Sequence, residues 1–451
     1  MLNPSATDIN HIWKSFPKKT FGPFAGGVPL AAIVTAGKLW PAPDAARTVG
    51  EGRRSHRQRE RFAVKIAELT AFHVRIPLRK PIRHASHRRT DTDNLLVRCV
   101  LEDKTEGWGE GVPRDYVTGE TIDSALALLR RSDLAAQRED CADFAGATTF
   151  AERLRLADVA GDDRGIQGNA ARCAVELAVL DAYGRRFGAP LSDATRLLAP
   201  DLYQPRSKVQ YSTAITSAKG FKLRLASWAM RLYGFRQLKV KVGITGQDDV
   251  ERLRSIRKRV GAGMELRVDA NEAWPAGEAV QRIQSLEPFG ISSVEQPLPH
   301  AELAALAEVR RQVRTPLMLD ESLCGMVDAE RAVAFGACDL FNLRLSKCGG
   351  FIPTLRLAQF AKANGLACQL GCQIGETAVL TTAGRHFAAS VSGLRFLEGS
   401  YDRHLVREAL GTRDFTFGWG GWAPALPGPG LGVTIDLRAL ERVTVRKETL
   451  F

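Results

Sequence analysis

Residues 265–297 read ELRVDANEAWPAGEAVQRIQSLEPFGISSVEQP, and this stretch decides the fold. It predicts two short strands, at 265–269 and 291–295, with a helical stretch between them, and each strand ends in a carboxylate. The same rhythm continues on both sides, one strand and one helical stretch together taking somewhat under 30 residues. This alternation is typical of parallel strands joined by helices.

The alternation predicts eight strands in the second half of the chain, enough to close a (β/α) barrel. They are expected at 209–216, 238–242, 265–269, 291–295, 316–320, 340–345, 367–370 and 394–398. The fold class is therefore α/β, a modified TIM barrel of the (β/α)7β type, over residues 206–451.

The first part of the chain has two other compositions. Residues 63–205 combine alternating runs, Gly-rich turns and helical segments, and predict an N-terminal α+β capping domain. Its clearest helix is expected from Asn169 to about Arg186. Residues 1–62 mix Pro, Gly, Ala and Arg and end in a highly polar run, so we interpret them as a basic, disordered extension.

The net charge of +13 raises the question of nucleic acid, but the extension alone supplies +6. The rest of the chain has no aromatic-interleaved basic helix and no zinc-finger spacing, so we expect no nucleic-acid partner. No apolar run approaches the length of a membrane span. The eight cysteines form no CxxC pair, which favours reduced core residues and a cytoplasmic protein. The apolar stretch 28–36 loosely resembles a signal peptide, so export stays an alternative.

Successive barrel strands finish in charged residues: Lys241, Asp269, Glu295, Asp320 and Lys347. The spacings are 28, 26, 25 and 27 residues, one strand–helix unit each. This puts the five side chains at one height on the C-terminal rim, where barrel enzymes keep their chemistry.

The three central acids, Asp269, Glu295 and Asp320, lie on adjacent predicted strands and form a cluster of hard oxygen ligands. Mg²⁺ is the natural occupant, with Mn²⁺ as a substitute, because without a cation the acids would repel one another. For one acid alone, a rim salt bridge would explain the residue as well.

Lys239 and Lys241 are two residues apart in one strand and therefore point to the same side, toward the barrel interior. Lys347 follows a strand four positions around the ring, on the opposite wall. A carboxylate substrate between Lys241 and Lys347 could lose an α-proton to one amine and regain one from the other, since a cation stabilises the enediolate.

Five motifs in order, KVKVG (239–243), VDAN (268–271), VEQP (294–297), LDES (319–322) and FNLRLSKCGG (341–350), resemble the enolase superfamily, muconate-lactonizing subgroup. The resemblance covers about residues 65–445. It implies metal ligands Asp269, Glu295 and Asp320, acid/base lysines Lys241 and Lys347, and Lys239 as an electrostatic helper.

The same resemblance suggests further residues near the site. Asn271 and Asn342 are expected beside the metal ligands, although either could cap a strand or loop. Glu376 is the candidate glutamate after the seventh strand, and a helix N-terminus would also favour an acid there. The family's specificity loops map to 81–94 and 112–121, where Arg83 could pair with a second substrate carboxylate or be a solvated surface charge.

The substrate class is left open among small carboxylates. Dipeptide epimerases of the subgroup carry Asp-x-Asp after the eighth strand, whereas Glu398 and Asp402 are spaced differently here, which counts against an α-amino dipeptide. Muconate cycloisomerase-like or epimerase/racemase-type isomerisation is expected, with o-succinylbenzoate synthase-like dehydration or a non-catalytic binding relative as alternatives. The family also suggests a homo-oligomer, for which no particular interface is indicated.

Overall fold

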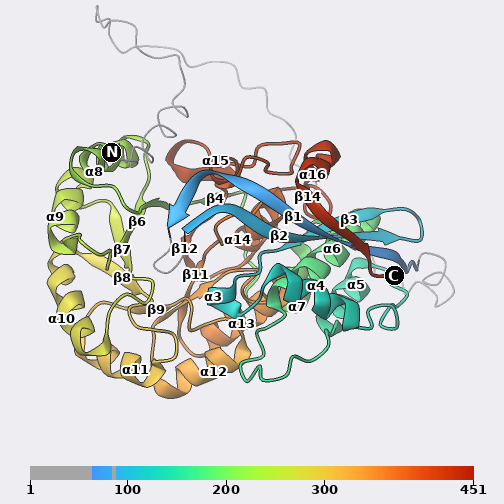
Figure 1. Ribbon diagram of the computed structural model, residues 1–451, viewed down its shortest axis with the longest axis horizontal. Coiled ribbons are helices and arrows are strands. Elements are labelled where there is room, and N and C mark those ends of the chain that lie inside the picture. The colour runs from blue at the N-terminus through green and yellow to red at the C-terminus, as the bar shows by residue number, and fades with distance from the viewer. Residues whose placement is uncertain (1–62, 84–87) are drawn as a thin grey trace, which may run out of the picture.

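The computed structural model describes residues 63–83 and 88–451 (Figure 1). The predicted extension, 1–62, and residues 84–87 lie outside the described residues. Within the described ranges, no helix is both long and apolar enough to cross a membrane.

Eight parallel strands form one curled sheet in chain order. They are β5 (Thr213–Ile215), β6 (Gln237–Lys241), β7 (Glu265–Asp269), β8 (Ile291–Glu295), β9 (Leu317–Leu319), β10 (Leu340–Leu343), β11 (Ala367–Leu370) and β12 (Leu394–Leu397). The first and last strands meet where the Ser212 amide donates to the Leu397 carbonyl at 2.8 Å. Figure 1 shows the sheet curling inside a ring of helices, as the predicted barrel requires.

Helices connect successive strands and cover the outside of the sheet. They are α8 (Gly220–Leu232), α9 (Asp249–Val260), α10 (Ala276–Leu286) with η1 (Glu287–Phe289), α11 (Leu303–Gln312), α12 (Met326–Phe335), α13 (Phe351–Ala363) and α14 (Ala378–Ser390). In α9, Asp248 caps the first turn and Leu253, Ile256 and Val260 are buried at steps of three and four.

Short elements replace an eighth outer helix after β12. They are α15 (Asp402–Leu405), η2 (Trp419–Gly421) and β13 (Trp422–Pro424), and β13 pairs with β4 (Lys208–Gln210) in an antiparallel ribbon. The expected strand 209–216 is thus two elements: β4 belongs to this ribbon, and only β5 belongs to the barrel.

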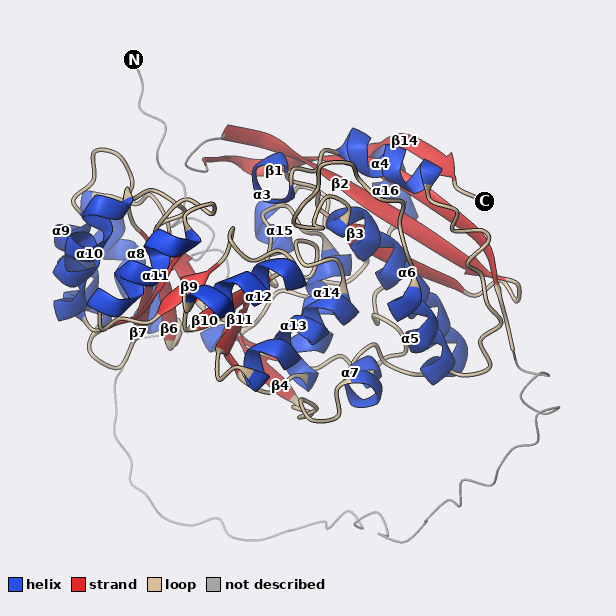
Figure 2. Cartoon of the chain, turned by 90° about the horizontal axis from the view of Figure 1, so that it is seen from below, coloured by secondary structure: helices blue, strands red, loops and turns tan. Residues whose placement is uncertain are grey.

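The capping part is built on a four-stranded antiparallel sheet in the order β14-β1-β2-β3. Its strands are β1 (Ile66–Arg83), β2 (Arg88–Leu101), β3 (Glu106–Gly111) and β14 (Thr444–Thr449). Its helices are α3 (Asp115–Thr118), α4 (Ile122–Arg131), α5 (Phe144–Arg153), α6 (Asn169–Phe187), α7 (Asp193–Leu198) and α16 (Leu437–Val443). Figure 2 shows this sheet and α6 beside the barrel.

Helix α6 is the centre of the cap and lies against β3. A side chain at Gly109 would place its Cβ 2.0 Å from the Ala174 carbonyl oxygen, and Gly107 and Gly111 are as tightly covered. The alternating glycines of β3 therefore let the helix approach the strand backbone closely.

Buried acids of the cap fasten it to the barrel. Glu176 on α6 accepts hydrogen bonds from the Phe351 and Ile352 amides at the start of α13, at 2.5 and 3.2 Å. Glu110 on β3 accepts from the Thr377 and Leu380 amides at the start of α14, at 2.9 and 3.0 Å. The cap is therefore fixed against the loops at the C-terminal ends of the strands.

Both segments expected to be specificity loops contain regular structure. Most of 81–94 belongs to β1 and β2, which form a long hairpin, and 112–121 contains the short helix α3. Arg114 lies in the second segment and donates to the Ile374 carbonyl at 2.9 Å, next to the loop after β11.

Candidate active site

The three predicted acidic ligands come together on adjacent strands. Asp269 ends β7, Glu295 ends β8, and Asp320 directly follows β9. Asp269 and Glu295 are register partners in the β7–β8 ladder. All three side chains are buried, with residue exposures of 4%, 0% and 1%. Burying three acids together is expensive unless they meet positive charge.

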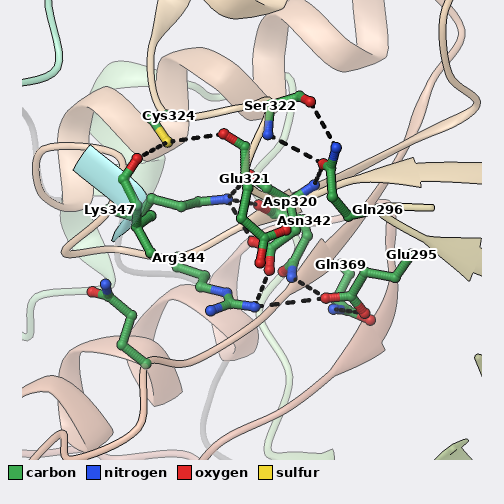
Figure 3. A network of polar contacts seen from close by, with 12 residues as sticks. Glu295, Gln296, Asp320, Glu321, Ser322, Cys324, Asn342, Arg344, Lys347 and Gln369 are labelled. Atoms are coloured by element: carbon green, nitrogen blue, oxygen red, sulfur yellow. Dashed lines mark hydrogen bonds and ion pairs between the residues drawn. The ribbon is translucent and has the colours of Figure 1, made fainter. Parts of the chain in front are cut away.

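Two cations link these acids pairwise. Lys239 Nζ lies 3.3 Å from Asp269 Oδ2 and 3.3 Å from Glu295 Oε2. The Arg344 guanidinium contacts Asp320 and lies 3.6 Å from Glu295 Oε1, and Figure 3 shows it pointing between the two carboxylates. Although burial opposes its charged form, the neighbouring carboxylates raise the pKa of Lys239.

The pKa values of Glu295 and Asp320 are shifted in opposite directions. Burial raises the pKa of Glu295, and the neighbouring acids add to the rise. For Asp320 burial acts in the same sense, but Arg344 and Lys347 outweigh it and lower the pKa. The cluster is therefore unevenly charged, with its most firmly ionised member beside Arg344 and Lys347.

Lys241 is the last residue of β6 and the register partner of Asp269. Its residue is partly exposed, and within 63–83 and 88–451 its amine makes no hydrogen bond or ion pair. By contrast Lys239, two residues earlier, is engaged by three carboxylates, including Glu398 Oε1 at 2.9 Å. Of the two lysines, Lys241 has the amine that is open to a substrate.

Lys347 lies in the turn after β10, four residues beyond its last residue, Leu343. Its amine donates to the Asp320 carbonyl at 2.7 Å, to Asp320 Oδ1 at 2.9 Å and to the Asn342 carbonyl at 2.8 Å. These three bonds use every hydrogen of the ammonium, and the side chain has no exposure. Lys347 therefore lies behind Asp320, packed into the rim.

Of the other expected site residues, some contact the three acids and one does not belong to the described side chains. Asn342 donates to Glu295 Oε1 at 2.8 Å, and Asn271 donates to Glu321 Oε1 at 3.3 Å and, through its backbone amide, to Asp269 Oδ1 at 3.1 Å. Both asparagines thus contact the acid cluster. Arg83 ends β1, and its side chain lies outside the described residues.

Glu376 lies in the loop after β11 and shares a small cavity of about 10 Å³ with Cys372 and Glu398. Its carboxylate accepts from the Gln373 amide at 2.6 Å, and burial raises its pKa to about 8. It is therefore near the barrel mouth, but no contact with the three acids is recorded among the described residues.

Two residues of the site were quoted in the motifs or loops but given no role there. Arg344 directly follows β10, as Asp320 directly follows β9, and the spacing of 24 residues between them was the available signal. Glu398 follows β12, and Arg267 and Lys239 hold its carboxylate at 2.5 and 2.9 Å. These two cations outweigh burial and lower the pKa of Glu398 to about 2.

The backbone after two of the acids is strained. Asn271 and Glu272 have φ of 42° and 65°, and Gln296 has φ of 36°, a region that non-glycine residues seldom occupy. The Gln296 side chain accepts from the Asp320 and Ser322 amides at 2.9 and 3.1 Å. Such strain persists only where surrounding contacts hold it, and it clusters at functional sites.

The donor set fits a hard divalent cation. Asp269, Glu295 and Asp320 offer only carboxylate oxygens, and the buried side-chain oxygens of Asn271 and Asn342 have no hydrogen-bond partner. In the described part of the chain no three acidic, histidine or cysteine side chains already converge on one point, and Lys239 and Arg344 bridge the acids instead. Mg²⁺ would be held by the three acids in place of these cations.

Comparison with known proteins identifies the family. Residues 223–439 match the family described as "Enolase C-terminal domain-like". An L-Ala-D/L-Glu epimerase of Clostridium acetobutylicum is 32% identical over 72% of this chain and 87% of its own length. Muconate cycloisomerase 1 of Pseudomonas putida is 28% identical over 82% of this chain and 95% of its own.

Solved structures agree. The N-succinyl Arg/Lys racemase from Bacillus cereus ATCC 14579 superposes with a TM-score of 0.73 at 25% identity, covering 85% of this chain and 99% of that one. The dipeptide epimerase from Enterococcus faecalis V583, complexed with Mg and L-Leu-L-Tyr, gives 0.70 at 27% identity over 82% and 99%. With the barrel, the cap and the acids at the strand ends, these matches show that the chain is an isomerase belonging to the enolase superfamily.

Proposed function

We propose that this isomerase removes the α-proton of a small carboxylate substrate, with Lys241 as the base and Asp269, Glu295 and Asp320 as Mg²⁺ ligands. The observation that carries the proposal is the trio of buried acids on adjacent strand ends beside the Lys241 amine, which has no partner among the residues that the structure describes. The cation would stabilise the negative charge that develops on the substrate carboxylate. The Mg complex of the related epimerase supports this ion, and Mn²⁺ suits the same oxygen ligands.

Lys239, Lys241 and Asn342 have different roles in this reaction. Lys239 stays paired with Glu398, which is not one of the proposed ligands, and supplies fixed positive charge beside the acids. Lys241 Nζ takes the proton from the α-carbon, and the electron pair moves into the carboxylate as an enediolate. Asn342 keeps Glu295 oriented through its 2.8 Å hydrogen bond.

The substrate we propose has no free α-ammonium group. Glu398 is held by Arg267 and Lys239, and Asp402 is buried with its pKa raised by burial to about 6. Neither carboxylate is available to bind an ammonium ion. An N-acylated amino acid or a non-amino acid suits this environment; the likeness to an N-succinyl Arg/Lys racemase supports the first class, and the likeness to a muconate cycloisomerase supports the second.

The test is α-proton exchange followed by proton NMR in D₂O with Mg²⁺. The panel holds N-succinyl-arginine, L-Ala-L-Glu and muconolactone. We expect exchange with N-succinyl-arginine or muconolactone, and a loss of about 10²–10⁴-fold in Lys241→Ala. The exposed Lys258 on α9 gives the control Lys258→Ala. Exchange that continues at the same rate in Lys241→Ala would exclude the assigned base.

A further inference from the structure

The opposite wall of the site from Lys241 carries two basic residues, Arg344 and Lys347. Strand β10 lies four positions from β6 in the order of the eight-stranded sheet, and both residues follow it. A base on this wall would reach the face of the substrate that Lys241 cannot reach. Which of the two residues faces the substrate therefore decides the stereochemistry of the reaction.

Lys347 does not face the substrate. Its amine is saturated by two backbone carbonyls and Asp320 Oδ1. The turn that carries it is tied to the cap, because Asn169 on α6 donates to the Lys347 carbonyl at 2.7 Å and to the Cys324 carbonyl at 2.8 Å. Swinging the amine out would break its hydrogen bonds to two buried carbonyls and to Asp320 Oδ1, which is unfavourable.

Arg344 faces the substrate. Its guanidinium points between Asp320 and Glu295, with the side chain 15% exposed, whereas the fully buried Lys347 amine ends at Asp320 and the Asn342 carbonyl (Figure 3). A guanidinium has five N–H donors in a fork that matches a carboxylate, and it stays protonated in proteins. It can hold a substrate carboxylate but is a poor proton carrier.

We propose that proton transfer at this site occurs on one face only, through Lys241, while Arg344 binds the substrate carboxylate from the other wall and Lys347 positions Asp320. This rests on the proposed function and deepens it. Lys241 takes the α-proton, and the same amine returns a proton to the same face. Inversion needs a second proton carrier opposite, whereas cycloisomerisation needs only one. Lys241 takes the α-proton, the electron pair forms the double bond between the α- and β-carbons, and the lactone oxygen leaves the β-carbon as a carboxylate of the same molecule; in the reverse direction the carboxylate adds and Lys241 returns the proton. The reaction class is therefore cycloisomerisation rather than epimerisation.

The experiment follows N-succinyl-L-arginine, N-succinyl-D-arginine and muconolactone separately in D₂O with Mg²⁺, using the full-length enzyme. The expected result is deuterium at the α-carbon of one arginine enantiomer with its configuration retained, or deuterium at one of the two α-hydrogens of muconolactone. Interconversion of the arginine enantiomers, or exchange of both muconolactone hydrogens at similar rates, would overturn the one-face inference alone. Absence of exchange from all three acids would overturn the proposed function and the inference with it.

Arg344→Lys gives the gain-of-function arm. It keeps the positive charge and places an amine on the second wall, so exchange from the previously inert face should rise by about tenfold or more. An unchanged inert face would count against Arg344 as the group opposite Lys241. Mg²⁺ titration and circular dichroism check that the variant is folded and binds the ion.

Lys347→Met separates positioning from catalysis. A positioning role predicts weaker Mg²⁺ binding and slower exchange, with the exchanging face unchanged. If this variant instead abolished exchange while Mg²⁺ affinity stayed at the wild-type value, Lys347 would be a proton carrier and the inference would fail.

Discussion

Buried acids occur in two regions of this molecule, and their partners differ. At the barrel rim, Asp269, Glu295 and Asp320 are paired with the charged ends of Lys239 and Arg344. These partners are long side chains that can release a carboxylate without disturbing the backbone.

At the joint between cap and barrel, the acids are held by backbone amides instead. Glu110 caps α14 and Glu176 caps α13, and inside the cap itself Glu120 accepts from the Ala170 amide at 3.1 Å, at the start of α6. Releasing these acids would leave helix N-termini without acceptors. The comparison teaches that the type of partner, rather than burial, separates an acid that can exchange its partner for a metal ion from one that holds the fold.

The largest expected effect is on the rim. Asp269→Asn removes one of the three anionic ligands, so Mg²⁺ affinity should collapse and turnover should fall by about 10³-fold or more. Calorimetric titration with Mg²⁺ and a turnover assay measure the two effects. The control is Glu278→Gln, which changes an exposed acid paired with Arg282 on the same helix. If Asp269→Asn bound Mg²⁺ as tightly as the wild type does, the rim acids would be structural, like the acids that bind backbone amides.

The second-largest expected effect is a loss of folding stability when an acid of the cap is replaced. Glu176→Ala leaves the Phe351 and Ile352 amides without this acceptor and removes the ion pair with Arg172, and should lower the free energy of unfolding by about 2–4 kcal/mol.

Urea unfolding measures that change, and the exposed Glu308, paired with Arg311, supplies the control Glu308→Ala, expected within about 0.5 kcal/mol of wild type. Mg²⁺ affinity of folded Glu176→Ala should be retained. A large loss of affinity at unchanged stability would erase the distinction between the two kinds of acid.

A buried base extends the comparison to pH. His386 on α14 is 1% exposed, its Nε2 lies 3.2 Å from the Leu431 carbonyl, and burial lowers its pKa to about 4. Between pH 6.5 and 4 the unfolded chain binds a proton that the folded chain does not, so stability should decrease as the pH falls, by up to about 3 kcal/mol. Thermal unfolding of wild type and His386→Gln at pH 7 and pH 4.5 tests this; parallel losses in both proteins would contradict it.

The smallest effect is expected from deleting residues 1–62. We propose that the cap, 63–205, and the barrel, 206–451, hold every group of the site, so kcat/KM and the unfolding temperature should not change measurably. Loss of activity on deletion, with the cap still folded, would show that the site draws on the extension.

The sequence is sufficient to predict the position of the acids, because each ends or directly follows a strand in a regular strand–helix alternation. Three strands, 265–269, 291–295 and 367–370, are found with the predicted bounds, and α6 extends one residue beyond the predicted 169–186. Regular spacing works here because parallel strands in a closed sheet leave little freedom in register.

The sequence is not sufficient to predict where a strand ends and how the residues of the following turn are placed. Residues 340–345 were expected to be one strand, but β10 ends at Leu343, and the following turn places Arg344 at the acids and Lys347 behind them. Counting intervals cannot distinguish two basic residues three positions apart across a turn. Likewise, no local signal divides 209–216 into β4 and β5, because the partner of β4 is β13, far along the chain.

The pairing of β14 with β1 has a consequence for how the chain is made. Thr444–Thr449 form the outer strand beside Ile66–Arg83, so the cap sheet has three strands from before the barrel in the sequence and one from after it. During synthesis, β1 leaves the ribosome with this edge unpaired, and it stays so until the whole barrel has been translated. An unpaired edge strand is a template for association with other chains. The nascent protein is therefore most exposed to aggregation at its cap, before the ribosome reaches the last strand.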